Sequence, residues 1–355
     1  MFDSISRRTA IAGAAFGTVL AVLHDKVRAA EPGSLTRIAF GSCCHQDRPQ
    51  PIWDVINAWH PELFIFLGDN IYADTEDMAV MAGKYSQLAA QSGFQTLRRN
   101  AQIVATWDDH DYGVNDGGSE YPKKAESRAM FLDFWGVPEG HFRRSHSGIY
   151  GSYTFGPTGR RVQVILPDNR TFRTPLLGYT VEPEDRGQYL VNPDPSATML
   201  GAQQWDWLEN ELRRPADLRI LASSTQVLAD APGYEAWINF QADHQRLLDL
   251  IDFAQVENLV MISGDTHYAE LSRLSDGMPY PLYDLTSSGL TQVWPVFGPN
   301  RLRIAQAPLM PNFGRITIDW NGAQPHVLLE VQMLDGSIAI NQAVPFAALR
   351  QSLGA

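Results

Sequence analysis

Four short polar clusters, each at the end of a run of apolar residues, constrain the fold of this chain more than any other feature. Buried strands of α/β proteins read as continuous apolar runs, so each cluster is predicted to begin where a strand ends. Open α/β sheets place their ligand-binding loops at such strand ends, which predicts one common site. The clusters are residues 40–45 (FGSCCH), 66–72 (FLGDNIY), 105–111 (ATWDDHD) and 262–268 (ISGDTHY).

Around these clusters the sequence predicts an α/β fold in which two sheets pack together under a cover of helices. No repeat or linker-like segment follows residue 35, so residues 31–355 are expected to form a single catalytic domain. Strands are predicted over residues 36–42, 63–67, 102–107, 148–155, 161–166, 218–223, 259–263, 315–320, 326–333 and 337–342. Helices are predicted over residues 51–59, 76–100, 123–135, 201–213 and 243–254, and a long surface loop over 176–198.

The first 30 residues carry the pattern of a cleaved twin-arginine export signal. Arg7 and Arg8 precede an apolar run over residues 10–23, which is too short to span a bilayer comfortably. Small residues around Ala29 then offer a cleavage site. We therefore expect a periplasmic or secreted protein that meets the twin-arginine export machinery and keeps no stable membrane span. A generic secretory signal and a membrane anchor are the alternatives.

Charge and cysteine content narrow the function classes. The formal net charge of −12 argues against a nucleic-acid partner, because such partners require basic surfaces. Only two cysteines are present, Cys43 and Cys44, and a disulfide between neighbours would be strained. One of these cysteines is therefore a candidate metal ligand or nucleophile.

The clusters offer the ligands of a two-metal hydrolase. Asp69 follows a glycine at a strand end, where its carboxylate could bridge two ions. Asp265 and His267 are spaced by one residue, so in extended backbone both point to the same side. Asp109 adds another carboxylate, and Cys43 would add a thiolate.

The motifs together resemble the alkaline phosphatase D (PhoD-like) family of metallophosphoesterases. They are Gly41-Ser42-Cys43, the GDNIY sequence at 68–72, the WDDHD sequence at 107–111 with Asn115-Asp116 after it, and the GDTH sequence at 264–267. The resemblance implies a four-layer αββα sandwich of two mixed sheets. It also implies a metal-dependent hydrolase of small phosphate esters, in which a metal-activated hydroxide attacks phosphorus in line.

The resemblance also assigns roles to residues. His110 takes the place of the catalytic histidine and acts with Asp69, and Gln226 is a weak candidate for the place of a further superfamily histidine. The implied metal ligands are Cys43, Asp69, Tyr72, Asp109, Asp265 and His267.

The family is associated with Fe³⁺ and Ca²⁺, and the donor chemistry agrees. The donors of Cys43, Tyr72 and His267 suit iron, whereas the oxygens of Asp109 and Asp265 suit calcium. Zn²⁺ or Mn²⁺ are the alternatives.

Asn115 and Arg170 are candidates for binding the phosphate group. Arginine can grip phosphate oxygens with two parallel hydrogen bonds, but Arg170 could equally pair with Asp168 and brace a loop. Asn115 could bind phosphate, complete a calcium shell or cap a turn.

Three other functions stay open at this point. One is a phospholipase-type phosphodiesterase at the same site, and another is a cysteine-nucleophile hydrolase that uses Cys43 or Cys44. The third is an exported metal- or phosphate-binding protein without turnover. Substrate preference is expected to depend on the loop at 174–200 and on the aromatic residues near Trp237 or Trp294.

Overall fold

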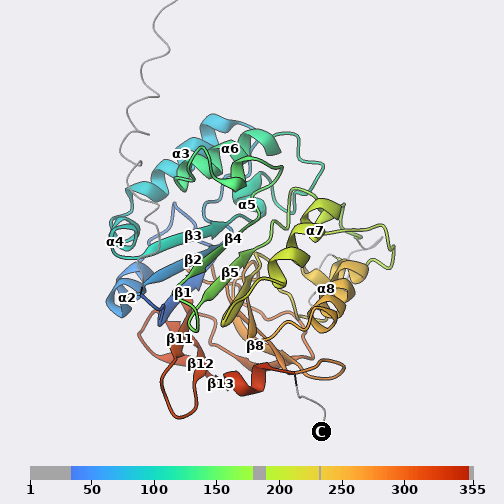
Figure 1. The fold of residues 1–355 in the computed structure, drawn as a ribbon. Helices are drawn as coiled ribbons and strands as arrows, with labels where there is room; N and C mark the ends of the chain where they lie inside the picture. Colours follow the sequence, from blue (N-terminus) through green and yellow to red (C-terminus); the bar gives the residue numbers. More distant parts are fainter. Residues whose placement is uncertain (1–32, 179–188, 232, 352–355) are drawn as a thin grey trace, which may run out of the picture.

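The computed structural model describes residues 33–178, 189–231 and 233–351, which fold into two packed β-sheets with helices outside them (Figure 1). The first sheet has the order β13-β12-β11-β1-β2-β3 and the second has the order β10-β8-β9-β7-β6-β5-β4. The strands of the first sheet are β1 (Arg37–Gly41), β2 (Leu63–Leu67), β3 (Gln102–Thr106), β11 (Asn312–Asp319), β12 (His326–Met333) and β13 (Ile338–Pro345). Those of the second are β4 (Gly151–Phe155), β5 (Val162–Leu166), β6 (Leu218–Ala222), β7 (Leu259–Ser263), β8 (Ala269–Leu274), β9 (Leu282–Ser287) and β10 (Arg303–Gln306).

Helices cover the outer faces of both sheets. In Figure 1, α3, α4 and α6 lie over the side of the molecule that holds β1–β3, and α7 and α8 lie beside the other sheet. The helices are α2 (Ile52–Trp59), α3 (Met78–Ala90), α4 (Ser92–Asn100), α5 (Asp109–Tyr112), α6 (Lys124–Phe134), α7 (Gly201–Leu212) and α8 (Gln241–Phe253), with short 3₁₀ turns at Phe142–Arg144, Trp237–Asn239 and Phe346–Leu349. This arrangement is the predicted αββα sandwich.

The side chains of β2 show how the layers are held together. Successive residues of a strand point to opposite faces, and every residue of β2 is buried. Phe64 and Phe66 pack in one apolar cluster with residues of α2, α3, α4 and α6, whereas Leu63, Ile65 and Leu67 pack against the second sheet. A strand buried on both faces explains the uninterrupted apolar run that predicted it.

The parallel strands bring the polar clusters to one place. Strands β1, β2 and β3 are parallel neighbours, so the residues after each strand lie at the same edge of the first sheet. Strands β6 and β7 are also parallel neighbours in the second sheet. Strand β9 is in turn parallel to β7. Backbone hydrogen bonds join the loops at these strand ends, because Gly264 N–H after β7 donates to the carbonyl of Ser224 after β6, and Leu290 N–H after β9 donates to the carbonyl of Ser42 after β1. Both sheets therefore contribute residues to one site.

Two parts of the secondary structure differ from the prediction. The helix expected over residues 76–100 is divided into α3 and α4, because Gln91 between them has an extended backbone. Strands β8, β9 and β10 and the short helix α5 were not predicted, since they contain charged and polar residues. Glu270 of β8 is fully buried, and Asn300 and Arg303 both donate hydrogen bonds to its carboxylate. These partners explain how a charged side chain can occupy an inner strand.

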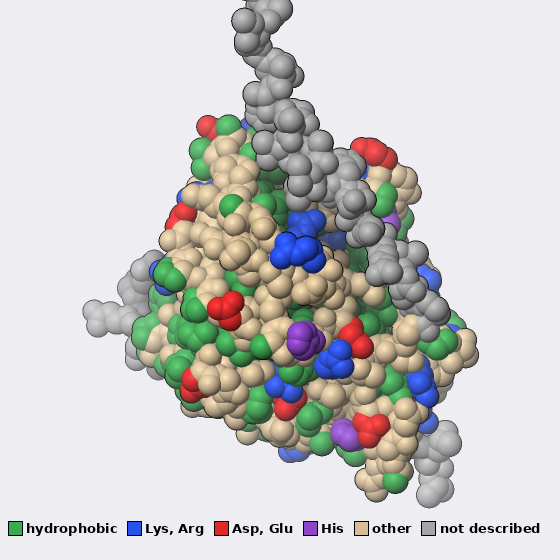
Figure 2. All heavy atoms as spheres, turned by 90° about the vertical axis from the view of Figure 1, so that its left-hand side faces the viewer, with side chains coloured by type: hydrophobic (Ala, Val, Ile, Leu, Met, Phe, Trp, Pro, Cys, Tyr) green, Lys and Arg blue, Asp and Glu red, His purple; other side chains and the backbone are tan. Residues whose placement is uncertain are grey.

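Two further features concern membrane spans and surface charge. Within the three described ranges, no helix combines the length and the hydropathy needed to cross a bilayer. Figure 2 shows the side of the molecule that lies at the left of Figure 1. On this face the basic side chains (blue) and the acidic side chains (red) of the described residues are mixed, and neither forms an extended patch. The predicted export signal at residues 1–30 lies outside the described residues.

Candidate metal centre

The six predicted metal ligands lie together at the carboxyl ends of the central strands. Among the described residues, four sets of donor atoms occur there, and within each set all atoms lie within 4.8 Å of one another. Asp69 belongs to three of the four sets. Those three are Cys43, Asp69 and His267; Asp69, Asp109 and His110; and Asp69, Asp108, Asp109 and Asp265, and the fourth is Asp109, Asp116 and Glu235.

The first half of the site combines sulfur, phenol and imidazole donors. Sγ of Cys43 lies 3.3 Å from Oδ2 of Asp69, and the phenol oxygen of Tyr72 lies 3.2 Å from the same carboxylate oxygen. The phenol oxygen also lies 3.0 Å from Nε2 of His267. The hydroxyl oxygen of Ser288 lies within hydrogen-bond distance of the Cys43 sulfur, at 3.1 Å. These four ligand side chains therefore converge on one small volume.

The second half of the site is a group of buried carboxylates. Asp108, Asp109 and Asp265 lie close to Asp69, and burial raises the pKa of Asp69 and of Asp265 well above the usual range. Neighbouring anions add to this effect, namely Cys43 and Asp109 for Asp69, and Asp108 for Asp265. Such crowding of acidic groups is costly without a cation between them.

Two buried oxygens of this group have no hydrogen-bond partner among the residues that the structure describes. They are Oδ1 of Asp69 and Oδ2 of Asp108. A buried carboxylate oxygen without a donor is rare in folded proteins, because its desolvation is then uncompensated. Metal ions at the donor sets would satisfy both oxygens, so the residues present fit a metal centre.

The backbone at the site is held in an uncommon conformation. Left-handed φ angles occur at Cys43 (60°), Asp69 (48°), Asp265 (72°) and His267 (59°), which are four of the six predicted ligands. Non-glycine residues rarely adopt this region, and their occurrence together is typical of a functional site. Asp111 helps to hold one of these turns, because its Oδ1 accepts the backbone N–H of Asp69 at 3.1 Å.

Glycines allow the strand-end loops to approach each other closely. Gly68 has a φ of 97°, and a Cβ atom there would lie 2.5 Å from Cβ of Asp108. A Cβ atom on Gly264 would lie 2.6 Å from Oγ of Ser42. Both glycines of the GD motifs are therefore required by contact, and Gly68 also by its backbone angle.

His110 lies between the donor atoms and a carboxylate that the sequence did not reveal. Its Nδ1 atom is 2.8 Å from Oδ1 of Asp74, and its ring packs on that of Tyr72 with centroids 4.2 Å apart. Burial alone would lower the pKa of His110, but the charges of Asp109, Asp69 and Asp74 raise it to about 11.

Arg170 is enclosed by acidic side chains rather than open to a ligand. It is fully buried, and it donates from Nε to Asp108 at 2.6 Å and from Nη1 to Glu235 at 2.7 Å. Asp168 accepts its backbone N–H at 3.0 Å. This geometry favours the bracing role that the sequence left open, with Asp108 and Glu235 as its side-chain partners.

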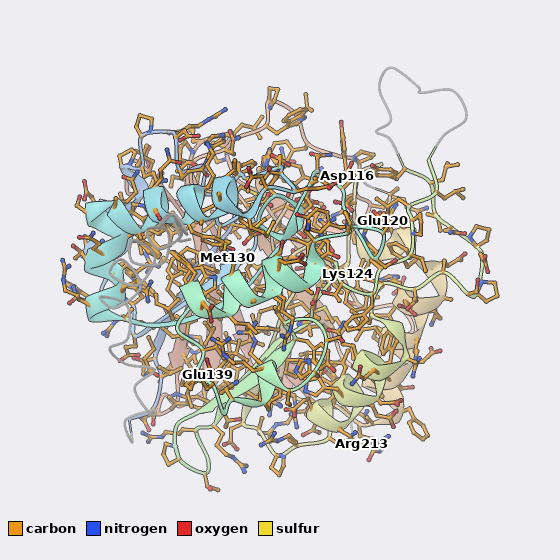
Figure 3. The ribbon with its side chains drawn as sticks, turned by 90° about the horizontal axis from the view of Figure 1, so that it is seen from above. Asp116, Glu120, Lys124, Met130, Glu139 and Arg213 are labelled. Carbon is orange, nitrogen blue, oxygen red and sulfur yellow. The ribbon has the colours of Figure 1, made fainter. Side chains whose placement is uncertain are left out.

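A pocket of about 170 Å³ opens beside the donor atoms. Asn115 lies in its wall and is exposed, as a phosphate-binding group would be. Figure 3 labels neighbouring Asp116 on the loop that leads to α6, with Glu120 and Lys124 further along the same segment. The lining residues are Asp109, His110, Asn115, Asp116, Tyr189, Tyr234, Glu235, Asp265, Thr266, His267, Tyr268, Trp294, Val296 and Gly298.

Two residues named from the sequence lie away from the donor atoms. Gln226 donates hydrogen bonds to Glu270 at 2.8 Å and to Thr286 at 3.0 Å, so its amide is used within the second sheet. Trp237 is fully buried and donates from Nε1 to Ser223, which makes it a core residue. Of the two tryptophans considered for substrate preference, only Trp294 lines the pocket.

Sequence reasoning missed three acidic residues of the site. Asp108 was visible inside the WDDHD motif, but its neighbour Asp109 was chosen as the ligand. Asp74 follows the GDNIY motif by two residues, a spacing that could have suggested it. Glu235 lies in a loop without any motif, and only the folded chain brings it to Arg170.

Comparisons with known proteins agree with this geometry. Alkaline phosphatase D of Bacillus subtilis (strain 168) is 22% identical over 218 residues, which cover 54% of this chain and 35% of that protein. The match therefore spans about a third of the relative's length.

Solved structures confirm the predicted fold. The structure of PhoD has a TM-score of 0.66 at 16% identity and covers 91% of this chain and 72% of its own. A dimetal phosphatase from Danio rerio has a TM-score of 0.57 at 12% identity, and the match covers 88% of this chain and 100% of the phosphatase. GAP50, the anchor in the inner membrane complex of Plasmodium, has a TM-score of 0.56 at 11% identity, and the match covers 90% of this chain and 96% of GAP50.

The family model supplies the final comparison. The model of the PhoD-like phosphatases matches residues 38–294, which include all four motifs and all six predicted ligands. This range is more than half of the chain. The protein belongs to the PhoD-like phosphatase family, as its motifs predicted.

Proposed function

We propose that this protein is an exported metal-dependent phosphoesterase whose active site is the donor cluster around Asp69. One observation carries the proposal: Asp69 is shared by three donor sets among the described residues. Its buried Oδ1 atom, which has no hydrogen-bond partner within that part of the chain, supports the same role. A carboxylate placed in this way suits a ligand shared by two ions. Membership in a phosphatase family supports a phosphate ester as the substrate.

The donor types divide the proposed metal sites. Cys43, Tyr72 and His267 would hold Fe³⁺, or Zn²⁺ or Mn²⁺ as alternatives, while Asp109 and Asp265 would hold Ca²⁺. Bound ions would neutralise the phosphate charge and lower the pKa of a water molecule.

The chain's own groups would position the substrate and move a proton. His110 lines the pocket, and its ring is fixed by the hydrogen bond of Nδ1 to Asp74. We infer that His110 protonates the leaving oxygen, because the surrounding carboxylates favour its charged form. Exposed Asn115 would donate a hydrogen bond to a phosphate oxygen from the pocket wall. Arg170 would hold Asp108 and Glu235 in place.

The cellular location belongs to the same proposal. Residues 1–30 would act as a twin-arginine export signal, and residues 31–355 would form the catalytic domain. The protein would then work in the periplasm or outside the cell. This route exports folded proteins, which suits an enzyme that receives its metal ions before export.

The decisive experiment compares metal content and turnover in one preparation. The purified full chain is assayed with 4-nitrophenyl phosphate and bis(4-nitrophenyl) phosphate, before and after exhaustive chelation. We expect chelation to abolish turnover and metal addition to restore it. Asp69→Asn should lose both metal and activity, whereas Asp335→Asn, in the exposed β12–β13 turn, should lose neither.

The same assay separates the other candidate functions. Activity that survives chelation but is lost on thiol alkylation would indicate a cysteine nucleophile. The structure gives little support to that reading, because Cys43 is fully buried and its sulfur lies beside the carboxylate of Asp69. Bound metal without turnover of either ester would indicate a binding protein instead.

A further inference from the structure

We propose that the pocket selects phosphate esters whose alcohol is apolar and uncharged, and that Trp294 is the main residue in this selection. This proposal rests on the proposed phosphoesterase function and adds the class of substrate. It follows from three features of the pocket: the order of its polar and apolar residues, the fixed position of Trp294, and the distribution of charge.

The pocket lining changes from polar to apolar between the donor atoms and the solvent. Asp109 and Asp265 lie at the donor cluster, whereas Tyr234, Trp294 and Val296 are exposed by 39%, 45% and 52%. Large apolar side chains gathered at the rim of a polar pocket are typical of a binding surface. A phosphate group at the donor cluster would therefore leave its ester substituent against these side chains.

Trp294 is held in place by a residue of the metal centre. Its backbone N–H donates to the carbonyl of His267 at 3.0 Å, and the two rings lie with centroids 6.1 Å apart. The indole is thus positioned relative to the donor cluster through the backbone. Aromatic faces gain substantially from covering an apolar group, which makes this side chain suitable for recognising one.

The charges of the pocket disfavour a second anionic group on the substrate. Among the described lining residues there are four carboxylates and no lysine or arginine. The metal centre and His110 would compensate one phosphate, but a further phosphate or carboxylate would meet the four carboxylates without a lysine or arginine in the lining. Nucleoside polyphosphates are therefore poor candidates for the substrate.

A cationic alcohol group is also disfavoured, because each carboxylate outside the donor cluster already has a partner on one oxygen, although Oε2 of Glu235 has none among the described residues. Glu235 accepts from Arg170 at 2.7 Å, and Asp116 accepts the hydroxyl of Tyr189. Arg173 lies 3.4 Å from Glu235 and compensates further charge. The exposed side chains of the lining are then those of Tyr234, Trp294 and Val296, with Asn115 as the polar one.

Binding of phosphonates tests the proposal without requiring turnover. The metal-loaded full chain is titrated calorimetrically with phenylphosphonate and methylphosphonate, which share the anionic head and differ in the apolar group. Trp294→Ala should weaken phenylphosphonate binding about tenfold and leave methylphosphonate binding unchanged. The control Phe253→Ala removes an aromatic side chain that is 77% exposed at the end of α8, away from the pocket, and should alter neither.

Three results would overturn the proposal: equal weakening of both phosphonates, no change in either, or tighter binding of phosphocholine than of phenylphosphonate. A chain that prefers phenylphosphonate through Trp294 but hydrolyses no ester would keep this inference and refute the proposed enzymatic function. Turnover of an ester together with phenylphosphonate binding that does not depend on Trp294 would refute this inference and keep the proposed enzymatic function.

Discussion

Asp74 holds His110 by a two-point contact, in which Nδ1 of the imidazole lies 2.8 Å and 2.9 Å from the two carboxylate oxygens. A backbone hydrogen bond also joins the two segments, because Ala73 N–H donates to the carbonyl of His110 at 3.1 Å. A carboxylate bound to one ring nitrogen fixes both the tautomer and the orientation of the imidazole. The loop after β2 therefore positions the histidine that follows β3.

Asp74→Asn should lower kcat about tenfold or more while leaving the metal content unchanged, because the amide no longer supports the charged imidazole. Steady-state kinetics with metal analysis of the same sample measures both. Glu76→Gln, an exposed change in the same loop, is the matched control and should have no effect. A parallel loss of metal and activity would instead assign Asp74 a structural role in the metal centre.

The adjacent cysteines allow a controlled test of the metal ligands. Cys43 contacts Asp69 and Ser288, whereas Cys44 is buried in the apolar cluster beneath the helices. Cys43→Ser should lose the ion of the first half of the site, and Cys44→Ala should keep it. Elemental analysis with an absorption spectrum measures this, because a thiolate or phenolate bound to Fe³⁺ absorbs visible light. Equal iron content in both variants would exclude Cys43 as a ligand.

Two glycines should respond oppositely to alanine. Gly68→Ala would place Cβ 2.5 Å from Cβ of Asp108 at a φ of 97°, so we expect a loss of roughly 1–3 kcal/mol in unfolding free energy. Gly83 lies inside α3 with open space around it, so Gly83→Ala should add about 0.5–1 kcal/mol. Urea unfolding at fixed metal concentration measures both variants. An unchanged midpoint for Gly68→Ala would show that the loop can shift without cost.

The sequence was sufficient for the elements and residues whose pattern is local. Strands β2 and β7 have the predicted bounds because each is five buried residues long and begins with a continuous apolar run, of five residues in β2 and four in β7. The six predicted ligands converge because parallel strands end at one edge, so each motif needed only its own strand to be recognised.

Other features depend on contacts between distant segments, which no local pattern records. Arg170 and Asp108 are 62 positions apart, and Glu235 is a further 65 positions from the arginine. Strand β8 could not be recognised from periodicity, since the partners of its buried Glu270 come from other segments. The role of Arg170 was therefore the least predictable part of the site.

Arg170 should matter for stability more than for phosphate affinity. Arg170→Met leaves the buried carboxylates of Asp108 and Glu235 without their cation, so we expect a loss of about 3–5 kcal/mol in unfolding free energy. Arg161→Met is the matched control, because it breaks a half-exposed pair with Asp217 and should cost less than about 1 kcal/mol.

Urea unfolding and competitive inhibition by inorganic phosphate separate the two roles of Arg170. If Arg170→Met does not fold, Arg170→Lys keeps a positive charge and should recover part of the stability without restoring both hydrogen bonds. In the folded variant, the inhibition constant for phosphate should stay within about threefold of its original value, since the guanidinium is enclosed by Asp108 and Glu235. A stable variant with phosphate inhibition weakened tenfold would show that Arg170 binds the substrate after all.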